Sequence, residues 1–401
     1  MALVLNEEQQ MLRDAARTFL QEMAPVSHLR KLRDDGVEAG FSSELWAQMV
    51  EMGWPAIIIP EQYGGLGYGY TGLGLVLEET GRTLTPSPLI ATALLGASAL
   101  SLSGNSVLCE QWLPAIASGE KLLSVAIDES PQHRPDNINT RASVEGEGFV
   151  LNGHKLSVMQ AQSADAFIVS ANTCPESSQQ PQNSTSLFLV TKETGGVTLE
   201  AVEWLDNQRA GKLTLTNVHV SKAQLLGPLN DGWPILQQIL DRGRIGMAAE
   251  LLGIAQESFE RTIQYLKERK QFGVPIGSFQ ALQHRAAEMF GEIELCKSVV
   301  LKALQSIDEA DTTAALNQAG EPPVAQSDQS RQSIALLASL AKAKCGQVAG
   351  QVTAEAIQMH GGIGMTDEFE IGFFIKRWRA LNQLLGDHRY HLNRFAELKA
   401  Y

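Results

Sequence analysis

The chain has 401 residues, enough to bury a large core and to divide into two or three units. Its formal net charge of −13 argues against a nucleic-acid-binding protein, because such proteins present a basic face to the phosphate backbone. A hydrophobic content of 44% is ordinary for a globular protein. The longest apolar segment, residues 89–102, is too short for a membrane span, and we expect it to be a buried helix.

The cysteines and the N-terminus bear on the cellular compartment. Cys109, Cys174, Cys296 and Cys345 are too far apart in the sequence to suggest a zinc site or a redox motif, so we expect reduced thiols and no metal. The N-terminus has no basic stretch followed by an apolar run and a cleavage site, which argues against a secretory signal. The simplest interpretation is a cytoplasmic protein.

Residues 1–120 have a helical pattern and are predicted to form an N-terminal α-helical domain. Asn6 followed by Glu7 and Glu8 indicates a helix start, and apolar spacing predicts further helices at residues 41–52 and 73–83. A change to strand-like runs near residue 121 then predicts a second domain.

Residues 121–230 are interpreted as a compact β-barrel or sandwich, because many short strands follow one another. We expect the strands at residues 122–127, 148–151, 155–158, 167–171, 187–190, 197–202 and 212–220. Asn152-Gly153 predicts a hairpin turn between two of them, and residues 174–186 an exposed loop.

Residues 231–401 are interpreted as a C-terminal α-helical domain. Gly232-Trp233-Pro234 indicates the return to helix. Apolar stripes predict a long helix at residues 235–267, a second from residue 282 and a third at residues 331–360, which Gly361 and Gly362 end. Residues 306–330 are polar and are expected to be a loose surface connection.

The turn between the first two of these helices carries more polar side chains than a connection between helices needs. Arg269, Gln271 and Gln280 lie beside Phe272 and Phe279. An arginine guanidinium can make a bidentate contact with a phosphate group, and aromatic rings can pack against a heterocycle. The turn is therefore a candidate site for an anionic, planar ligand. On these residues alone, an ordinary connection capped by Gly and Pro is the alternative.

Two motifs resemble a known family. Residues 265–273, Tyr-Leu-Lys-Glu-Arg-Lys-Gln-Phe-Gly, together with Phe279 and Gln280, resemble the flavin-binding junction of the acyl-CoA dehydrogenases. Residues 358–366, Gln-Met-His-Gly-Gly-Ile-Gly-Met-Thr, are similar to that family's C-terminal signature. The resemblance covers essentially the whole chain. It implies an α+β fold with an N-terminal helical domain, a central β-barrel or sandwich and a C-terminal four-helix bundle.

The resemblance further implies FAD, held between the β domain and the C-terminal helices, usually in a tetramer. By position, Arg269 and Phe272 contact the diphosphate and adenine end, while Gln358 and Gly362 reach it from an adjacent subunit. Backbone amides near Ala126 and Asp128 serve the flavin ring. The full set of implied cofactor-binding residues is Arg269, Gln271, Phe272, Phe279, Gln280, Gln358, Gly361, Gly362, Ala126 and Asp128.

The chemistry that the resemblance implies is oxidation of an acyl-CoA thioester to its 2-enoyl form, with electron-transfer flavoprotein as the electron acceptor. A carboxylate removes the proton beside the carbonyl while the flavin receives the hydride. Both positions where the family carries this Glu are glycine here, Gly386 and Gly243. The candidate bases are therefore Asp387 and Asp241, one and two residues away.

Each candidate base has an ordinary structural explanation. Asp387 could cap the last helix, and Asp241 could pair with neighbouring arginines; Glu250 is a more distant candidate. The flavin-ring side also departs from the family, since Met159 stands where its Trp-Ile-Thr segment has a hydroxyl.

Two hypotheses follow. The first is a divergent FAD-dependent acyl-CoA dehydrogenase, forming a homotetramer. The second is a non-catalytic partner subunit that completes a neighbour's FAD site in a heterotetramer acting on steroid or other bulky acyl-CoA thioesters. The length and class of the acyl chain are not set by the sequence.

Overall fold

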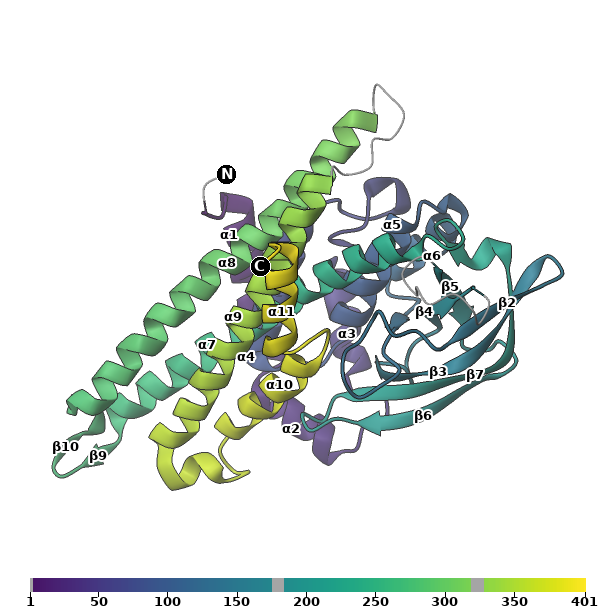
Figure 1. Cartoon of the computed structure of the whole chain (residues 1–401). Coiled ribbons are helices and arrows are strands. Elements are labelled where there is room, and N and C mark those ends of the chain that lie inside the picture. The colour runs from purple at the N-terminus through teal and green to yellow at the C-terminus, as the bar shows by residue number, and fades with distance from the viewer. Residues whose placement is uncertain (1–2, 175–183, 319–327) are drawn as a thin grey trace. The chain divides into compact units, whose positions relative to one another are not determined.

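The structure, a computed structural model, describes residues 3–174, 184–318 and 328–401. The chain forms two compact units. The helical unit comprises Met1–Lys31, Tyr70–Thr85 and Arg244–Tyr401, and the β-containing unit comprises Leu32–Gly69 and Pro86–Gly243. Helical, β-rich and helical segments follow one another along the chain as expected (Figure 1). The four cysteines are free thiols.

Long helices dominate the helical unit. They are α1 (Glu7–Met23), α4 (Tyr70–Thr83), α8 (Gln280–Gln318), α9 (Asp328–His360), α10 (Ile371–Gln383) and α11 (His388–Leu398), together with most of α7 (Gly232–Glu268). α9 packs against α8, α10 and α11, and α4 packs against α1 and α8 (Figure 1). The predicted starts at Asn6 and Gly232 and the stop at Gly361 are confirmed. Asn6 and Gln9 form a reciprocal capping box.

Glycines bring α4 and α7 into backbone contact. A Cβ at Gly253 of α7 would lie 1.8 Å from the carbonyl oxygen of Glu78, and one at Gly81 of α4 would lie 2.2 Å from that of Glu250. No larger side chain fits at either position without moving a helix. This crossing places Glu78 of α4 close to α7.

The expected surface connection at residues 306–330 is wrong over its first half, because α8 continues to Gln318; residues 319–327 lie outside the described residues. The polar composition has a different cause. The Asp308 carboxylate accepts hydrogen bonds from the backbone N–H groups of Tyr70, at 2.6 Å, and Thr71, at 2.9 Å. A side chain of α8 thus accepts hydrogen bonds from backbone N–H groups at the start of α4, which have no partner within their own helix. Burial raises the pKa of Asp308.

The β-containing unit carries one eight-stranded mixed sheet in the order β6-β7-β3-β2-β4-β5-β8, with β1 paired to β4. Its strands are β1 (Leu123–Ala126), β2 (Arg141–Glu145), β3 (Gly148–Met159), β4 (Ala166–Asn172), β5 (Thr185–Thr191), β6 (Val197–Glu203), β7 (Arg209–Ser221) and β8 (Leu225–Leu226). Short helices accompany them: α2 (Val26–Asp34), which begins in the helical unit, α3 (Ser43–Glu51), α5 (Ala97–Ser103), α6 (Ser106–Ala117) and a π-helix (Leu89–Gly96). The π-helix is entirely buried, as predicted.

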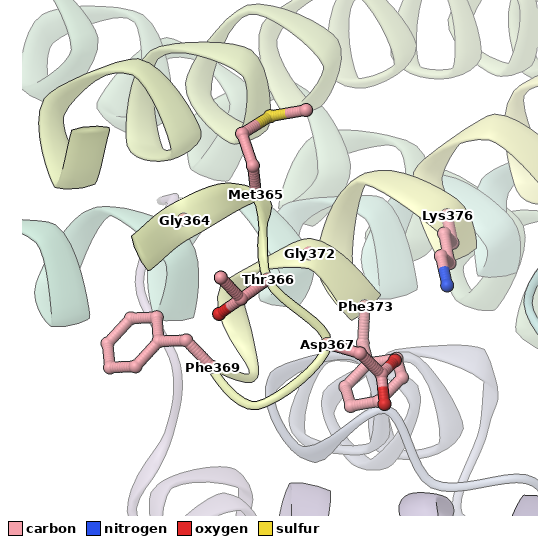
Figure 2. A pocket seen from close by; sticks show the side chains of 8 residues that line it. All are labelled: Gly364, Met365, Thr366, Asp367, Phe369, Gly372, Phe373 and Lys376. Atoms are coloured by element: carbon pink, nitrogen blue, oxygen red, sulfur yellow. The ribbon is translucent and has the colours of Figure 1, made fainter. Parts of the chain in front are cut away.

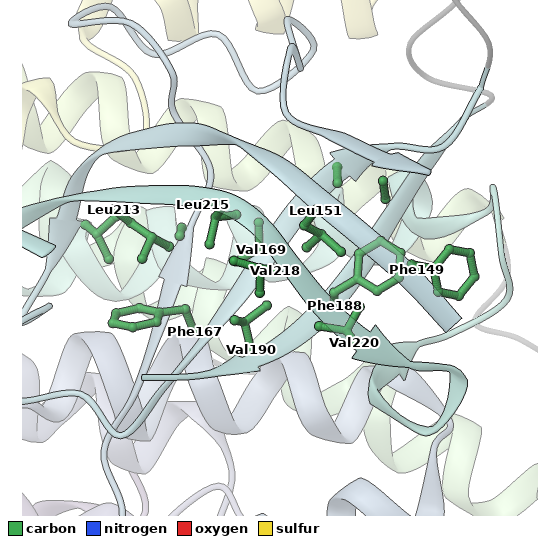
Figure 3. Packing of buried hydrophobic residues seen from close by; sticks show 14 of the residues in the cluster. Phe149, Leu151, Phe167, Val169, Phe188, Val190, Leu213, Leu215, Val218 and Val220 are labelled. Atoms are coloured by element: carbon green, nitrogen blue, oxygen red, sulfur yellow. The ribbon is translucent and has the colours of Figure 1, made fainter. Parts of the chain in front are cut away.

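The sheet curves so that distant strands share one core. β3 and β5 are separated by two strands in the sheet order, yet the rings of Phe149 and Phe188 meet edge to face with centroids 5.1 Å apart (Figure 3). Leu151, Val169 and Val190 belong to the same buried cluster (Figure 3). This curvature agrees with the barrel or sandwich expected from the strand pattern.

The hairpin predicted at Asn152-Gly153 is wrong. Both residues lie inside β3, and the turn between β2 and β3 falls instead between Glu145 and Gly148, which pair with each other. Asn152-Gly153 marks a register shift between β3 and β7, where the Asn152 side chain accepts a hydrogen bond from the Asn217 N–H at 2.8 Å. A local signal for a turn is thus used as a β-bulge. Most of the loop expected at residues 174–186 lies outside the described residues.

Candidate functional site

The turn between α7 and α8 is a small hairpin whose tip carries an exposed aromatic ring. β9 (Lys270–Gln271) pairs with β10 (Val274–Pro275), which leaves Phe272 and Gly273 as the two turn residues. Both have positive φ, 55° and 81°, as the tight hairpin turn requires. A bulky residue in this conformation is strained, and the Phe272 side chain is 91% exposed. Strain and exposure together indicate a functional position rather than a core one.

The turn and the C-terminal signature border one cavity of about 690 Å³ in the helical unit. The cavity's volume falls in the range typical of ligand sites. Of the predicted cofactor-binding residues, the structure brings seven together at this cavity: Arg269, Gln271, Phe272, Phe279, Gln358, Gly361 and Gly362. The two motifs are about 90 residues apart in the sequence, and a single chain suffices to unite them.

The cavity suits a diphosphate joined to an aromatic heterocycle. Among the residues that the structure describes, no hydrogen bond or ion pair engages the Arg269 guanidinium, so its donors are available to an anion. A Cβ at Gly361 or Gly362 would meet nothing within 4 Å, which leaves backbone open to a ligand. The rings of Phe272 and Phe279, with centroids 6.2 Å apart, supply aromatic surface beside the charge. The residues present therefore fit the FAD that the sequence motifs imply.

His360 is a cavity residue that the sequence analysis did not single out. Its ring stacks on Tyr265 at 4.3 Å between centroids, and its Nδ1 lies 2.7 Å from the Ala356 carbonyl oxygen. Burial lowers the pKa of His360, so the imidazole is neutral and Nδ1 carries the proton. The neutral ring thus forms an apolar wall of the cavity. Its place directly before Gly361-Gly362 was the only signal that could have found it.

Three predicted residues are not at this cavity. Gln280 is exposed at the start of α8 and is not among the lining residues. Ala126 and Asp128 belong to the β-containing unit, where Ala126 ends β1. The Asp128 carboxylate lies 2.9 Å from Nδ1 of His133, so its side chain is engaged within its own loop.

The first of the two base positions, Gly386, has no room for a side chain unless Tyr390 or the loop backbone shifts. Its φ is +106°, a conformation that L-residues rarely adopt. A Cβ there would lie 2.3 Å from Cδ1 of Tyr390 and 2.9 Å from Nε2 of His391. The loop conformation thus favours glycine, and a glutamate at this position would require Tyr390 or the backbone to move.

Buried cationic and polar groups hold this loop through its carbonyl oxygens. The Lys342 ammonium donates to the carbonyls of Leu381, at 2.9 Å, and Gly386, at 3.0 Å. The Leu385 carbonyl accepts from Arg244 Nε at 3.1 Å and lies 3.1 Å from His391 Nε2. Burial lowers the pKa of Lys342 to about 7, and the nearby charge of Arg244 contributes to this lowering.

The three carboxylates considered as bases each lie in a structured environment. Asp387 is the N-cap of α11, and its carboxylate accepts a hydrogen bond from the Tyr390 N–H at 2.8 Å. Asp241 is only 4% exposed on α7, in the β-containing unit. Glu250 forms a buried ion pair with Arg377 at 2.7 Å. None of these arrangements identifies a base by itself.

A second cavity, of about 130 Å³, is lined by the last residues of the C-terminal signature and by the segment that follows it (Figure 2). Asp367 and Phe373 both line it, and the Met365 side chain points away from them (Figure 2). Arg30 pairs with Asp367 at 3.0 Å and lies over the Phe373 ring at 4.8 Å. The volume is below that of ordinary ligand sites, so we interpret these contacts as anchoring the segment between α9 and α10.

The structure also bears on membrane insertion and metal binding. In the described part of the chain, none of the helices combines the length and apolar character that crossing a membrane requires. Within residues 3–174, 184–318 and 328–401, no group of His, Cys, Asp or Glu side chains is arranged to hold a metal ion.

Comparison with known proteins gives concordant results. Three family models match: acyl-CoA dehydrogenase N-terminal domain over residues 6–120, middle domain over residues 131–218 and C-terminal domain over residues 230–398. A probable acyl-CoA dehydrogenase of Bacillus subtilis, YngJ, is 32% identical over 92% of this chain and 91% of its own length.

Two solved structures are similar in fold and in sequence. A variant of the Tcur3481-Tcur3483 steroid ACAD has a TM-score of 0.82 at 29% identity and covers 98% of both chains. The ChsE4-ChsE5 complex of Mycobacterium tuberculosis has a TM-score of 0.84 at 25% identity and covers 100% of this chain and 99% of the other. The chain therefore belongs to the acyl-CoA dehydrogenase family and is an oxidoreductase that acts on acyl-CoA.

Proposed function

We propose that this chain is an FAD-binding subunit of a heteromeric enzyme that oxidises an acyl-CoA thioester to the 2-enoyl-CoA, and that a related chain supplies the catalytic carboxylate. The observation that carries the proposal is the pairing of a cavity lined by seven of the ten predicted cofactor-binding residues with a base position, Gly386, that is crowded by Tyr390. Arg269, Gly361 and Gly362 are arranged for FAD, whereas the backbone at Gly386 has no room for a side chain.

Each cavity residue has a role in holding the cofactor. Arg269 would neutralise the diphosphate, and the open backbone at Gly361 and Gly362 would allow its close approach. Phe272 and Phe279 would shield the adenine end from water. The bound flavin supplies a hydride acceptor for the β-carbon of the substrate. The conformation around Gly386 leaves removal of the α-proton to a carboxylate outside this loop.

The relatives support an assembly of two related chains acting on a bulky substrate. One similar structure is a complex of ChsE4 with ChsE5, and another is described as a steroid ACAD. We propose that this chain belongs to a heterotetramer that acts on a steroid-like or other bulky acyl group and passes electrons to electron-transfer flavoprotein. We also propose a cytoplasmic location, which the free thiols favour.

The alternative is a self-sufficient homotetramer with Asp387 as the base. It is favoured by one observation, the position of Asp387 directly after Gly386. The substitution Asp387→Asn separates the two roles of this residue, because asparagine caps a helix about as well as aspartate but cannot accept the proton. Asp241→Asn tests the second candidate in the same way.

Cofactor binding is tested first on the purified chain. Titration with FAD, followed by calorimetry and by the visible flavin spectrum, gives the affinity of the wild type and of Arg269→Gln. Losing a charge-assisted contact of about 1.5 to 3 kcal/mol should weaken FAD binding by roughly ten- to hundredfold. Arg379→Gln, which removes an exposed arginine outside the cavity lining, is the matched control. Equal affinities for the three proteins would contradict the assignment of the cavity.

The division of labour is tested by anaerobic addition of a panel of acyl-CoA thioesters, including a steroid-side-chain thioester. We expect the flavin to stay oxidised on the chain alone and to bleach when a related chain with the glutamate is co-purified. Bleaching on the chain alone would establish a self-sufficient dehydrogenase, and loss of that bleaching in Asp387→Asn would identify its base.

A further inference from the structure

A third cavity, of about 350 Å³, lies in the helical unit apart from the site described above. It is bordered by the N-terminal segment and by α1, α4, α7 and α8. Its apolar lining residues are Leu3, Val4, Leu5, Leu75, Leu252, Val300, Leu301 and Leu304. Its volume and apolar walls are those of a small-molecule site, and no step of the proposed reaction uses it.

Two polar side chains in this lining have unused hydrogen-bond acceptors. Glu78 of α4 lines the cavity and receives a hydrogen bond from the Gln256 amide of α7. The other end of that amide, Oε1, is buried without a partner among the described residues, on a side chain that is 7% exposed. A buried acceptor left unmatched costs free energy, so the site favours a molecule that brings donors.

The cations of the lining are already engaged. Arg17 makes two hydrogen bonds to the Glu79 carboxylate, at 2.7 and 3.1 Å. Arg13 binds Asp14 at 3.3 Å, and Lys297 binds Glu294 at 2.6 Å. Each of these cations is thus paired with a carboxylate outside the lining, whereas Oε1 of Gln256 has no partner among the described residues.

We propose that this cavity binds a small alkylammonium ion, with the ammonium group donating to Glu78 and to Gln256 Oε1 and the alkyl chain lying against the leucine and valine walls. The carboxylate supplies the opposite charge that a desolvated cation requires. An alkyl carboxylate would find its head group facing Glu78, and the cations that could attract it are held by their own partners.

The charge state of Glu78 makes the proposal testable by pH. Burial, together with the neighbouring charge of Glu79, raises the pKa of Glu78 to about 7, while Arg13 and Arg82 act in the opposite direction. A carboxyl with this pKa is about one-tenth ionised at pH 6 and about nine-tenths ionised at pH 8. Because an alkylammonium stays charged over this range, its affinity should rise about tenfold from pH 6 to pH 8.

The experiment is calorimetric titration of the full-length protein with n-hexylamine, hexan-1-ol and hexanoate at pH 6 and pH 8. We expect one molecule of hexylammonium to bind, about tenfold more tightly at pH 8, and binding to be lost in Glu78→Gln. Glu288→Gln, which removes an exposed carboxylate of α8 that does not line the cavity, is the matched control and should bind as the wild type does.

A second variant, Leu301→Trp, fills the cavity without touching Glu78 and should also abolish binding. Hexanoate binding as tightly as hexylammonium, a pH-independent preference for hexan-1-ol, or unchanged amine binding in Glu78→Gln would each overturn the proposal. FAD titration of the same variants should give wild-type affinity, so this test succeeds or fails independently of the cofactor cavity.

Discussion

Substitution of Gly386 gives the sharpest test of the reasoning about the base position. In Gly386→Ala the new Cβ would lie 2.3 Å from Cδ1 of Tyr390, whereas an ordinary contact is 3.4–4 Å. The Tyr390 ring must therefore move by about 1 Å or the loop backbone must shift. The ring is not free to move without loss, because its hydroxyl accepts a hydrogen bond from Arg244 at 3.1 Å and its face lies 5.4 Å from that guanidinium.

The expected destabilisation can be built from these contacts. Placing alanine at a φ of +106° costs about 1 kcal/mol or more. Weakening a hydrogen bond to a charged donor and a cation–π contact adds about 1 to 3 kcal/mol. We therefore expect a loss of about 2 to 4 kcal/mol in the free energy of unfolding. With the usual unfolding entropy per residue, this lowers Tm by roughly 2 to 5 °C for a chain of 401 residues.

The assay is thermal unfolding of a double-mutant cycle formed by Gly386→Ala and Tyr390→Ala. Removing the Tyr390 ring should relieve the closest contact, but neither the backbone strain nor the 2.9 Å approach to Nε2 of His391, so Gly386→Ala should cost about 1 to 2 kcal/mol in that background. Gly104→Ala is the control, because Gly104 has a positive φ of 68° and a methyl group there would meet nothing within 4 Å. It reports the backbone penalty alone.

Two results would refute the reasoning. One is a Gly386→Ala protein as stable as Gly104→Ala, which would show that the site has room for a side chain. The other is Gly386→Glu folding normally and acquiring dehydrogenation of acyl-CoA on its own, which would mean that the loop is an intact base site lacking only its carboxylate.

Further predictions concern buried charges and the cap of the last helix. Because the pKa of Lys342 is about 7 when folded and about 10.5 when unfolded, its protonation favours the unfolded chain between these values. The stability of the wild type relative to Lys342→Met should therefore rise from pH 7 to pH 9, by up to about 1.4 kcal/mol per pH unit, and denaturant unfolding showing no such rise would contradict this. Glu129→Gln should destabilise the β-containing unit by about 3 to 5 kcal/mol, since it leaves the Lys155 ammonium, 2.7 Å away, buried without its carboxylate; most of the loss should return in Glu129→Gln/Lys155→Met. Asp387→Ala should cost about 1 kcal/mol in thermal unfolding through loss of the cap, whereas Asp387→Asn should leave stability nearly unchanged.

Features that depend on neighbouring residues in the chain were predictable. The capping box at Asn6, the start of α7 at Gly232 and the stop after His360 all follow from side chains within one helical turn of the helix end. The order of helical, β-rich and helical segments follows from hydrophobic periodicity. The two motifs that indicate the family are likewise contiguous stretches.

Local signals failed where a distant segment competes for the same residues. Asn152-Gly153 predicts a turn, but the strand continues because Asn217 of β7 takes up the Asn152 side chain. The polar run after Ser306 resembles a loop, but α8 continues through it to Gln318, and Asp308 within it caps the start of α4. In both cases, a polar side chain that suggests a turn or loop instead makes a hydrogen bond to a segment far along the chain.

By itself, the sequence determined the family, the implied cofactor and the absence of a glutamate at Gly386 and Gly243. Only the tertiary structure decided that seven of the predicted residues share one cavity, and that Tyr390 closes the space a side chain at Gly386 would need. The physical reason is that each motif consists of consecutive residues and can be recognised without the fold. The room for a side chain at Gly386, and the presence of an unpartnered acceptor beside Glu78 and Gln256, depend instead on side chains that folding brings together from different helices.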